Sequence, residues 1–201
     1  MSLALRREPN QRRSRERVEG ILAAAAALIV EKGSDAMRMG EVAAKADVSI
    51  GSLYQYFPDK AAIIRRLAER YNGEGRACIQ AALATPRSMK DLRAAFLGLV
   101  DTYYALFLAS PVMRDIWSGT QADKALREIE LADSRANGAI LAGALARLRP
   151  GVDRAVLVAS AFLIMQLGEA TMRLAISVER AEGDALVAAY KRLVDRELAA
   201  T

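Results

Sequence analysis

Apolar residues recur along the chain three or four positions apart, the spacing of one face of an α-helix, and alternating strand-like runs are scarce. Alanine, leucine, arginine and glutamate dominate these segments, and most of them are strong helix formers. Pro58, Pro86, Pro111 and Pro150 fall between or at the ends of the periodic segments, where a missing backbone N–H is tolerated. The pattern predicts an all-α fold of about nine helices, over residues 12–32, 39–46, 50–56, 60–83, 88–109, 112–117, 121–149, 153–178 and 183–199.

Two of the short predicted helices, 39–46 and 50–56, are joined by a tight turn at Asp47 and Val48. Ser49 precedes the second helix, where its hydroxyl can accept a hydrogen bond from an unpaired backbone N–H. The apolar inner positions of the pair are Val42, Ala43, Ala46, Leu53 and Phe57. Two helices joined in this way form a helix-turn-helix, whose second helix fits the major groove of DNA.

The helix-turn-helix is preceded by an apolar helix and by Gly33, which follows Lys32 as a left-handed cap. Between residues 17 and 67 a set of positions fits one pattern in order and spacing: Ile21, Leu22, Ala24, Ala25, Gly33, Val42, Ala43, Ala46, Val48, Ser49, Gly51, Leu53, Tyr54, Tyr56, Phe57 and Lys60. In these positions the chain resembles the tetracycline-repressor (TetR) family of bacterial transcriptional regulators. The remaining residues are similar to the family in length and helical architecture.

The resemblance implies that the outer positions of 50–56 face DNA. Gln55 could bond an adenine or a phosphate, Ile50 could contact a thymine methyl group, and Gly51 would allow close approach. Tyr54 and Tyr56 resemble backbone-contacting tyrosines, with packing against the first helix as the alternative. The expected DNA contacts are Arg38, Ser49, Ile50, Gly51, Ser52, Tyr54, Gln55, Tyr56 and Lys60, the last resembling a phosphate-contacting lysine.

One position departs from the family pattern. Where the family usually has Ser or Thr to cap the first helix of the pair, this chain has Arg38 between two methionines. A missing side-chain cap costs about 1 kcal/mol. Either this helix end frays, or Arg38 settles on a DNA phosphate.

The chain carries 29 basic and 24 acidic side chains, a net charge of +5, and the surplus is concentrated at the N-terminus. Residues 1–66 hold 12 basic and 8 acidic side chains. We predict a DNA-binding domain at 1–60, with 1–11 as a flexible arm. Two interpretations of Arg12, Arg13, Arg15 and Arg17 stay open: an arm that follows the DNA backbone or minor groove, and a disordered basic tail.

Residues 61–201 are predicted to form a larger helical domain for effector binding and dimerisation. A small helix-turn-helix reads few base pairs, so specificity requires two copies. The helix at 153–178 is apolar on two faces, of which an ordinary intrachain core accounts for one. The family pairs its last helices across a twofold axis, which implies a homodimer interface at Leu163, Leu167, Leu174, Leu186, Tyr190, Leu193 and Val194.

Polar residues interrupt the apolar surface of the same helix. Gln166, Glu169 and Arg173 stand in line with apolar neighbours, and buried polar groups need partners. One interpretation is a pocket for a small, largely apolar effector, lined by Tyr103, Phe107, Met113, Trp117, Met165, Gln166 and Glu169. The other is an intrahelical Glu169–Arg173 ion pair in a regulator without an inducer.

Composition narrows the function classes further. The chain has no histidine and one cysteine, so Ser/His/Asp and Cys/His catalysis and the common zinc sites are excluded. We expect no enzyme activity, catalytic residue, metal or cofactor, and Cys78 is interpreted as a core residue rather than a reactive thiol. The uncharged run 155–168 is too short to span a membrane, and no signal peptide is evident. The prediction is a cytoplasmic, homodimeric repressor that binds a partly palindromic operator in double-stranded DNA and is released by a small, largely apolar ligand. A DNA-binding regulator without an inducer and a protein-interaction module are the alternatives.

Overall fold

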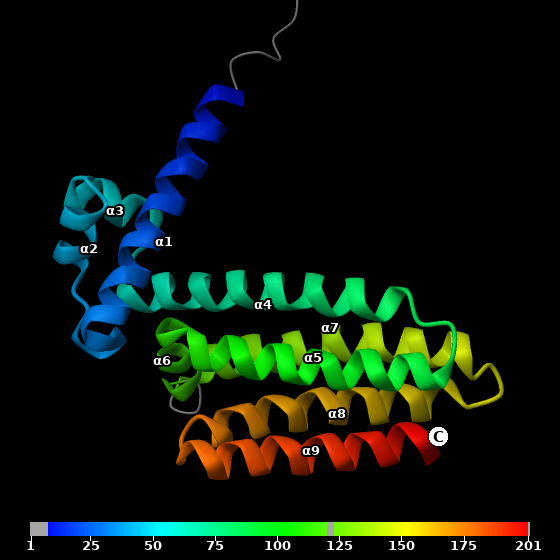
Figure 1. The fold of residues 1–201 in the computed structure, drawn as a ribbon. Helices are drawn as coiled ribbons and strands as arrows, with labels where there is room; N and C mark the ends of the chain where they lie inside the picture. Colours follow the sequence, from blue (N-terminus) through cyan, green and yellow to red (C-terminus); the bar gives the residue numbers. More distant parts are fainter. Residues whose placement is uncertain (1–7, 120–122, 201) are drawn as a thin grey trace, which may run out of the picture. The chain divides into compact units, whose positions relative to one another are not determined.

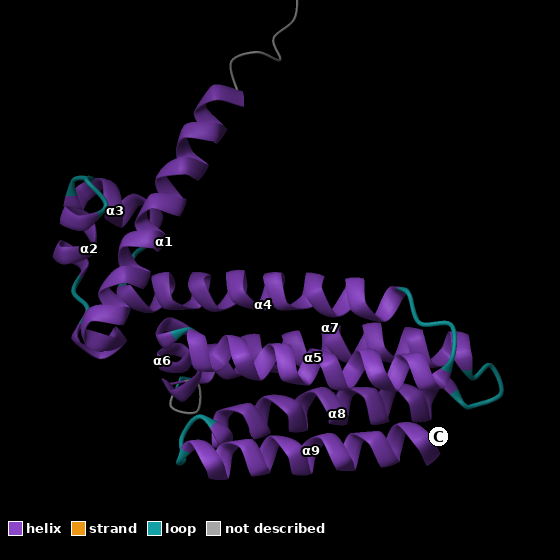
Figure 2. Ribbon diagram, viewed as in Figure 1, coloured by secondary structure: helices purple, strands orange, loops and turns teal. Residues whose placement is uncertain are grey.

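The computed structural model describes residues 8–119 and 123–200 of the chain. Within them it contains nine helices and no strand, which confirms the predicted all-α fold (Figures 1 and 2). The helices are α1 (Glu8–Ala36), α2 (Met39–Lys45), α3 (Ile50–Tyr56), α4 (Lys60–Ala84), α5 (Met89–Ala109), α6 (Pro111–Gly119), α7 (Lys124–Leu148), α8 (Arg154–Ala175) and α9 (Arg180–Ala200).

The predicted helices agree with these bounds except at a few ends. The helix α8 ends at Ala175 rather than at residue 178, and α9 begins at Arg180 rather than at residue 183. The predicted start of the seventh helix at residue 121 lies outside the described residues, and α7 begins after Asp123, whose carboxylate accepts from the backbone N–H groups of Ala125 and Leu126.

The prediction of a flexible arm over 1–11 is wrong for its last residues, because α1 already begins at Glu8; residues 1–7 lie outside the described part. The arginines at 12, 13, 15 and 17 therefore lie on a helix. Arg12 donates to Glu16 four positions on at 2.8 Å, a spacing that favours the helix over an extended arm.

The chain divides into two units, Met1–Ala68 and Glu69–Thr201, and the division falls within α4. In the N-terminal unit α2 packs on α1 and α3. Gly33 has a φ of 80° and a ψ of 159°, a conformation that side chains disfavour. The positive φ is as predicted, but ψ lies outside the left-handed helical region, and α1 is interrupted by a kink before it ends at Ala36.

In the C-terminal unit α7 and α8 form the most extensive helix pair, and α5 packs on α9. The helix α9 packs along α8 (Figure 1). Gly138 of α7 permits the close approach to α8, because a Cβ atom there would lie 2.9 Å from the Cα of Phe162. The helix α5 contributes five buried side chains to the core of this unit: Leu92, Phe96, Val100, Tyr104 and Phe107.

Two helices of the C-terminal unit, α5 and α8, are long and apolar enough to cross a membrane by length and composition. The sequence prediction counted only the uncharged run and missed this. Core helices of globular bundles pass the same test, and both helices here pack among the other helices of the unit.

Candidate nucleic-acid interface and ligand cavity

The turn between α2 and α3 sets the direction of α3. Asp47 has a φ of 52°, in the left-handed region that aspartate tolerates better than most residues. The hydroxyl of Ser49 accepts a hydrogen bond from the backbone N–H of Ser52 at 3.1 Å, as predicted for an N-cap. The chain thus reverses in a few residues and starts α3 with its first turn satisfied.

The two faces of α3 differ sharply. Leu53 is fully buried and Phe57 is 6% exposed, whereas Ile50 and Tyr54 are 46% and 51% exposed. Gly51 and Gln55 are also exposed, and Ser52 is half-buried. The outer face of α3 therefore presents one apolar, one aromatic and one amide side chain, which are the groups that read thymine methyls and base edges in a major groove.

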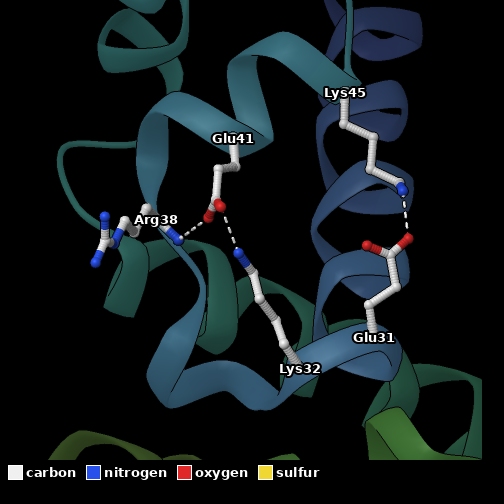
Figure 3. A network of polar contacts seen from close by, with 5 residues as sticks. All are labelled: Glu31, Lys32, Arg38, Glu41 and Lys45. Atoms are coloured by element: carbon white, nitrogen blue, oxygen red, sulfur yellow. Dashed lines mark hydrogen bonds and ion pairs between the residues drawn. The ribbon is translucent and has the colours of Figure 1, made fainter.

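A network of polar contacts holds α2 against the end of α1 (Figure 3). The Lys45 ammonium lies 2.5 Å from the Glu31 carboxylate, and Lys32 lies 2.5 Å from Glu41. Glu41 also accepts a hydrogen bond from the backbone N–H of Arg38 at 3.1 Å. The bond from Lys32 lowers the pKa of the Glu41 carboxyl. Two contacts on one short helix fix its orientation on α1.

The same network answers the question raised by Arg38. The N-terminus of α2 has no side-chain cap from residue 38, and the Glu41 carboxylate instead ties the backbone there. The guanidinium of Arg38 points away from these contacts (Figure 3). It lies on the exposed surface, available to an anion outside the chain.

Two of the predicted DNA-contacting residues have polar groups engaged inside the unit. The Lys60 ammonium donates to the carbonyl oxygens of Ser34 and Asp35 at 3.1 and 2.8 Å, at the end of α1. The Tyr56 hydroxyl interacts with Ser14 and with Arg17 of α1, and these contacts lower its pKa. Tyr56 thus links α3 to α1, in line with the alternative of packing against the first helix. Lys60 links α4 to the end of α1, a role that the sequence pattern does not reveal.

The C-terminal unit contains a cavity of about 330 Å³ bordered by α4, α5, α6, α7, α8 and α9. Its lining is mainly apolar and aromatic, with Tyr71, Phe96, Tyr103 and Tyr190 among the side chains. The exposed residues Glu74, Cys78, Thr102 and Leu106 also border it. A volume of this size at the lower end of the range for ligand pockets accommodates a small molecule.

Four of the seven predicted ligand residues line this cavity: Tyr103, Met113, Met165 and Glu169. The other three do not, and their assignment is corrected. Phe107 and Trp117 are buried next to the lining residue Tyr103. The ring of Phe107 packs edge-to-face on Tyr103 with a centroid separation of 5.1 Å, and Trp117 packs edge-to-face on Phe107 at 5.6 Å. The lining residues of α8, such as Met165 and Glu169, lie on one face of the helix. Gln166 follows Met165 by one residue, about 100° around α8, and so lies off this face.

The contributions of α4 and α9 to the cavity were not predicted from the sequence. Tyr71 and Glu74 come from α4 and Tyr190 from α9, helices that no pattern in the sequence brings together. Cys78 was interpreted as a core residue, and this is wrong, because the thiol-bearing residue is exposed and borders the cavity.

A cluster of buried polar residues on α7 includes Asn137, which lines the cavity, and Glu130, Asp133 and Ser134, which interact with the cavity-lining Glu169. Glu130, Asp133, Ser134 and Asn137 are 8%, 4%, 0% and 6% exposed, which is unusual burial for such residues. Asp133 pairs with Arg76 of α4 and accepts from the Asn137 amide at 2.9 Å.

The alternative prediction of a Glu169–Arg173 pair is wrong. The Arg173 guanidinium instead lies 2.9 Å from the Glu130 carboxylate of α7. Burial raises the pKa of Glu169 well above its usual range. The Ser134 hydroxyl lowers this pKa, whereas the charges of Glu130 and Asp133 raise it further. Burial likewise raises the pKa of Asp133, although Arg76 opposes it.

The predicted dimer residues fall into two groups. Leu163, Leu167, Leu174 and Leu193 are 58%, 47%, 51% and 63% exposed, and Leu186 is half-buried. Tyr190 and Val194 are buried inside the unit, so assigning them to an interface between chains is corrected. The Tyr190 hydroxyl donates to the carbonyl oxygen of Ile164 at 2.7 Å, which fixes α9 on α8.

No group of three or more aspartate, glutamate or cysteine side chains in the part of the chain that is described is arranged to hold a metal ion.

Known structures share this architecture. A TetR-family transcriptional regulator from Streptomyces coelicolor is 26% identical, with 92% of this chain and 98% of that chain aligned and a TM-score of 0.67. The transcriptional regulator FadR from Bacillus subtilis, in complex with stearoyl-CoA, is 18% identical over 90% of this chain and 96% of its own, with a TM-score of 0.63. The reduced form of NemR from E. coli is 20% identical over 88% of this chain and 96% of its own, with a TM-score of 0.60. No curated protein sequence matches.

Two family models cover most of the sequence. Residues 21–67 match the model described as bacterial regulatory proteins of the tetR family, which confirms the resemblance seen in the helix-turn-helix. Residues 90–201, more than half of the chain, match the tetracyclin repressor-like C-terminal domain. The members of this family are DNA-binding regulators rather than enzymes. The protein therefore belongs to the TetR family of transcriptional regulators.

Proposed function

We propose that the protein is a homodimeric cytoplasmic repressor that binds a partly palindromic operator and leaves it when a small, largely apolar ligand occupies the cavity. The observation that carries the proposal is the outer face of α3, where Ile50, Tyr54 and Gln55 are exposed on the second helix of a helix-turn-helix. In this proposal residues 1–60 read DNA and residues 61–201 bind ligand and partner.

Individual DNA contacts follow from this surface. Ile50, Gly51, Ser52, Tyr54 and Gln55 face base edges and neighbouring phosphates. Arg38 and Ser49, at the starts of α2 and α3, contact the backbone.

The two residues engaged with α1 keep a capacity for DNA. The Lys60 ammonium has three N–H donors, of which Ser34 and Asp35 use two, so one remains for a phosphate. Tyr56 contacts the backbone while its link to α1 sets the angle of α3.

The test is selection of bound fragments from random duplex DNA, followed by titration of variants on the selected site. Tyr54→Ala and Gln55→Ala should each weaken binding by about 1 to 3 kcal/mol without unfolding the protein. Lys60→Ala should lower affinity for all sequences and reduce the salt slope by about one unit. Lys90→Ala, an exposed lysine of the C-terminal unit, is the control. Unchanged binding in the first three variants would refute the assignment of α3.

Dimerisation is supported by an unpartnered apolar stripe. Val156, Leu163, Leu167 and Leu174 follow one another at helical spacing along α8, and all are about half exposed. Leu193 is 63% exposed on α9, which packs along α8. Monomeric soluble proteins rarely expose contiguous apolar patches of this kind, and a second copy would cover it isologously.

Leu193→Glu should therefore produce monomers with poor operator affinity, measured by sedimentation velocity. Leu131→Glu places the same charge on an exposed leucine of α7 outside the stripe and should stay dimeric. A monomeric wild type, or a dimeric Leu193→Glu variant, would place the interface elsewhere.

Ligand control is supported by the cavity. The fold can hold a ligand with a long acyl chain, as the FadR complex with stearoyl-CoA illustrates. A tenfold change in operator affinity requires about 1.4 kcal/mol of coupling between the two sites. Trp117, the sole tryptophan of the sequence, lies two ring contacts from the cavity-lining Tyr103 and should report binding by fluorescence.

A further inference from the structure

The lining of the cavity contains one carboxyl group, that of Glu169 on α8, which no cation balances. Glu130 is paired with Arg173 and Asp133 with Arg76, and each pair joins two helices. Glu169 forms no ion pair within the described part of the chain. Its Oε2 atom is buried and has no hydrogen-bond partner there, and the residue lines the cavity.

Such a carboxyl group is costly in a folded protein. Removing a carboxylate from water without a compensating charge is strongly unfavourable, so the group keeps its proton or meets a cation. The pKa of Glu169 is raised accordingly. The charged and titratable groups around it are Glu74 and Arg76 of α4, Tyr103 of α5, Glu130 and Asp133 of α7, Arg173 of α8 and Tyr190 of α9. Both arginines are already paired, so none of these groups supplies the missing positive charge.

The rest of the cavity also favours a cation over an anion. An anionic group placed near Glu169 would lie beside three carboxyl groups, counting Glu130 and Asp133. Aromatic side chains attract cations through their negatively charged faces, and Tyr71, Phe96 and Tyr103 border the same space. The remaining lining is apolar, which suits an alkyl or aryl body.

We propose that the ligand of this cavity is an amphiphilic cation, with one ammonium-type charge beside Glu169 and an apolar body along the aromatic lining. This inference rests on the proposed function, since it names the chemical class of the effector. Binding ionises Glu169: its O–H bond breaks, the proton passes to solvent, and the carboxylate pairs with the ligand's positive charge.

Octyltrimethylammonium, 1-octanol and octanoate are suitable probes, because they share an octyl-type tail and differ in head-group charge. Isothermal titration calorimetry on the full chain should show the cation binding at least about tenfold more tightly than either other probe, as expected for a buried charge pair. The quaternary ammonium has no proton to lose. Titrations in phosphate and Tris should therefore reveal release of about one proton from the protein at neutral pH.

Glu169→Gln should abolish both the preference for the cation and the proton release, while octanol affinity stays the same. Glutamine has nearly the shape of the protonated acid, so the variant should fold, as circular dichroism will verify. Glu74→Gln is the matched control, because this exposed carboxylate borders the same cavity and pairs only loosely with Arg70, at 3.9 Å. It should change cation affinity less than about threefold, as expected for an exposed charge.

Tighter binding of octanoate, no binding of the cation, or a wild-type cation complex without proton release would each overturn the proposal. So would loss of the cation preference in Glu74→Gln instead of Glu169→Gln. Operator release is measured separately: a cation that binds as expected but leaves the operator bound supports the ligand class and contradicts the proposed control of DNA binding.

Discussion

Gly138 lies where α7 packs directly against the backbone of α8, and replacing it with alanine tests the geometry of the C-terminal unit. A Cβ atom at this position would lie 2.9 Å from the Cα and 3.1 Å from the backbone nitrogen of Phe162. Favourable contacts between non-bonded carbon atoms require about 3.5 to 4.0 Å. Because both obstacles are backbone atoms, no rotamer change can relieve the overlap, and the two helices must separate.

The expected magnitude is the balance of two effects. Alanine in a helix interior is about 1 kcal/mol more stabilising than glycine. Overpacking of a close interface costs about 1 to 3 kcal/mol, and backbone obstacles place this site in the upper half of that range. Gly138→Ala should therefore lower the free energy of unfolding by about 1 to 2 kcal/mol.

Gly143→Ala on the same helix is the matched control, since a Cβ atom there meets nothing within 4 Å. It should stabilise the protein by about 0.5 to 1 kcal/mol. Urea denaturation followed by circular dichroism at one protein concentration measures both variants. If Gly138→Ala is as stable as Gly143→Ala, the close packing of α7 on α8 is incorrect. Asn137, the neighbour of Gly138 in the chain, lines the cavity, so the destabilised variant should also bind cavity ligands more weakly.

Three further predictions concern single contacts. Ser49→Ala removes the cap of α3 and should cost about 1 kcal/mol in thermal or urea unfolding, and an unchanged midpoint would contradict the cap. Tyr190→Phe removes the buried bond to Ile164 and should cost about 1 kcal/mol, measured in the same way. The raised pKa of Glu169 means that the folded state holds a proton that the unfolded state loses above its ordinary value of 4.5. The contribution of Glu169 to the free energy of unfolding therefore falls as the pH rises from about 5 toward the raised pKa, by at most about 1.4 kcal/mol per pH unit. Wild type compared with Glu169→Gln isolates this term, because the other carboxyl groups are common to both; parallel pH profiles would contradict it.

The helices and the helix-turn-helix follow from local features of the sequence. The inward positions of Leu53 and Phe57, the cap at Ser49 and the turn at Asp47 depend on neighbours a few residues away, so periodicity and capping rules predict them. The exposed outer face of α3 follows from the same spacing. Family membership could be inferred for the same reason, because the matching positions lie within one short segment.

Only the tertiary structure decided how distant residues are paired. Arg173 has a candidate partner four residues away, yet it binds Glu130, 43 residues distant, and Arg76 binds Asp133 across 57 residues. These pairs leave Glu169 unbalanced, and α4 and α9 complete the cavity around it. Lys60 and Tyr56 are held by α1 in the same way. A helical pattern states which face of a helix is apolar, but which helix covers that face depends on packing of the whole chain, and for this reason Phe107, Trp117 and Val194 proved to be core residues.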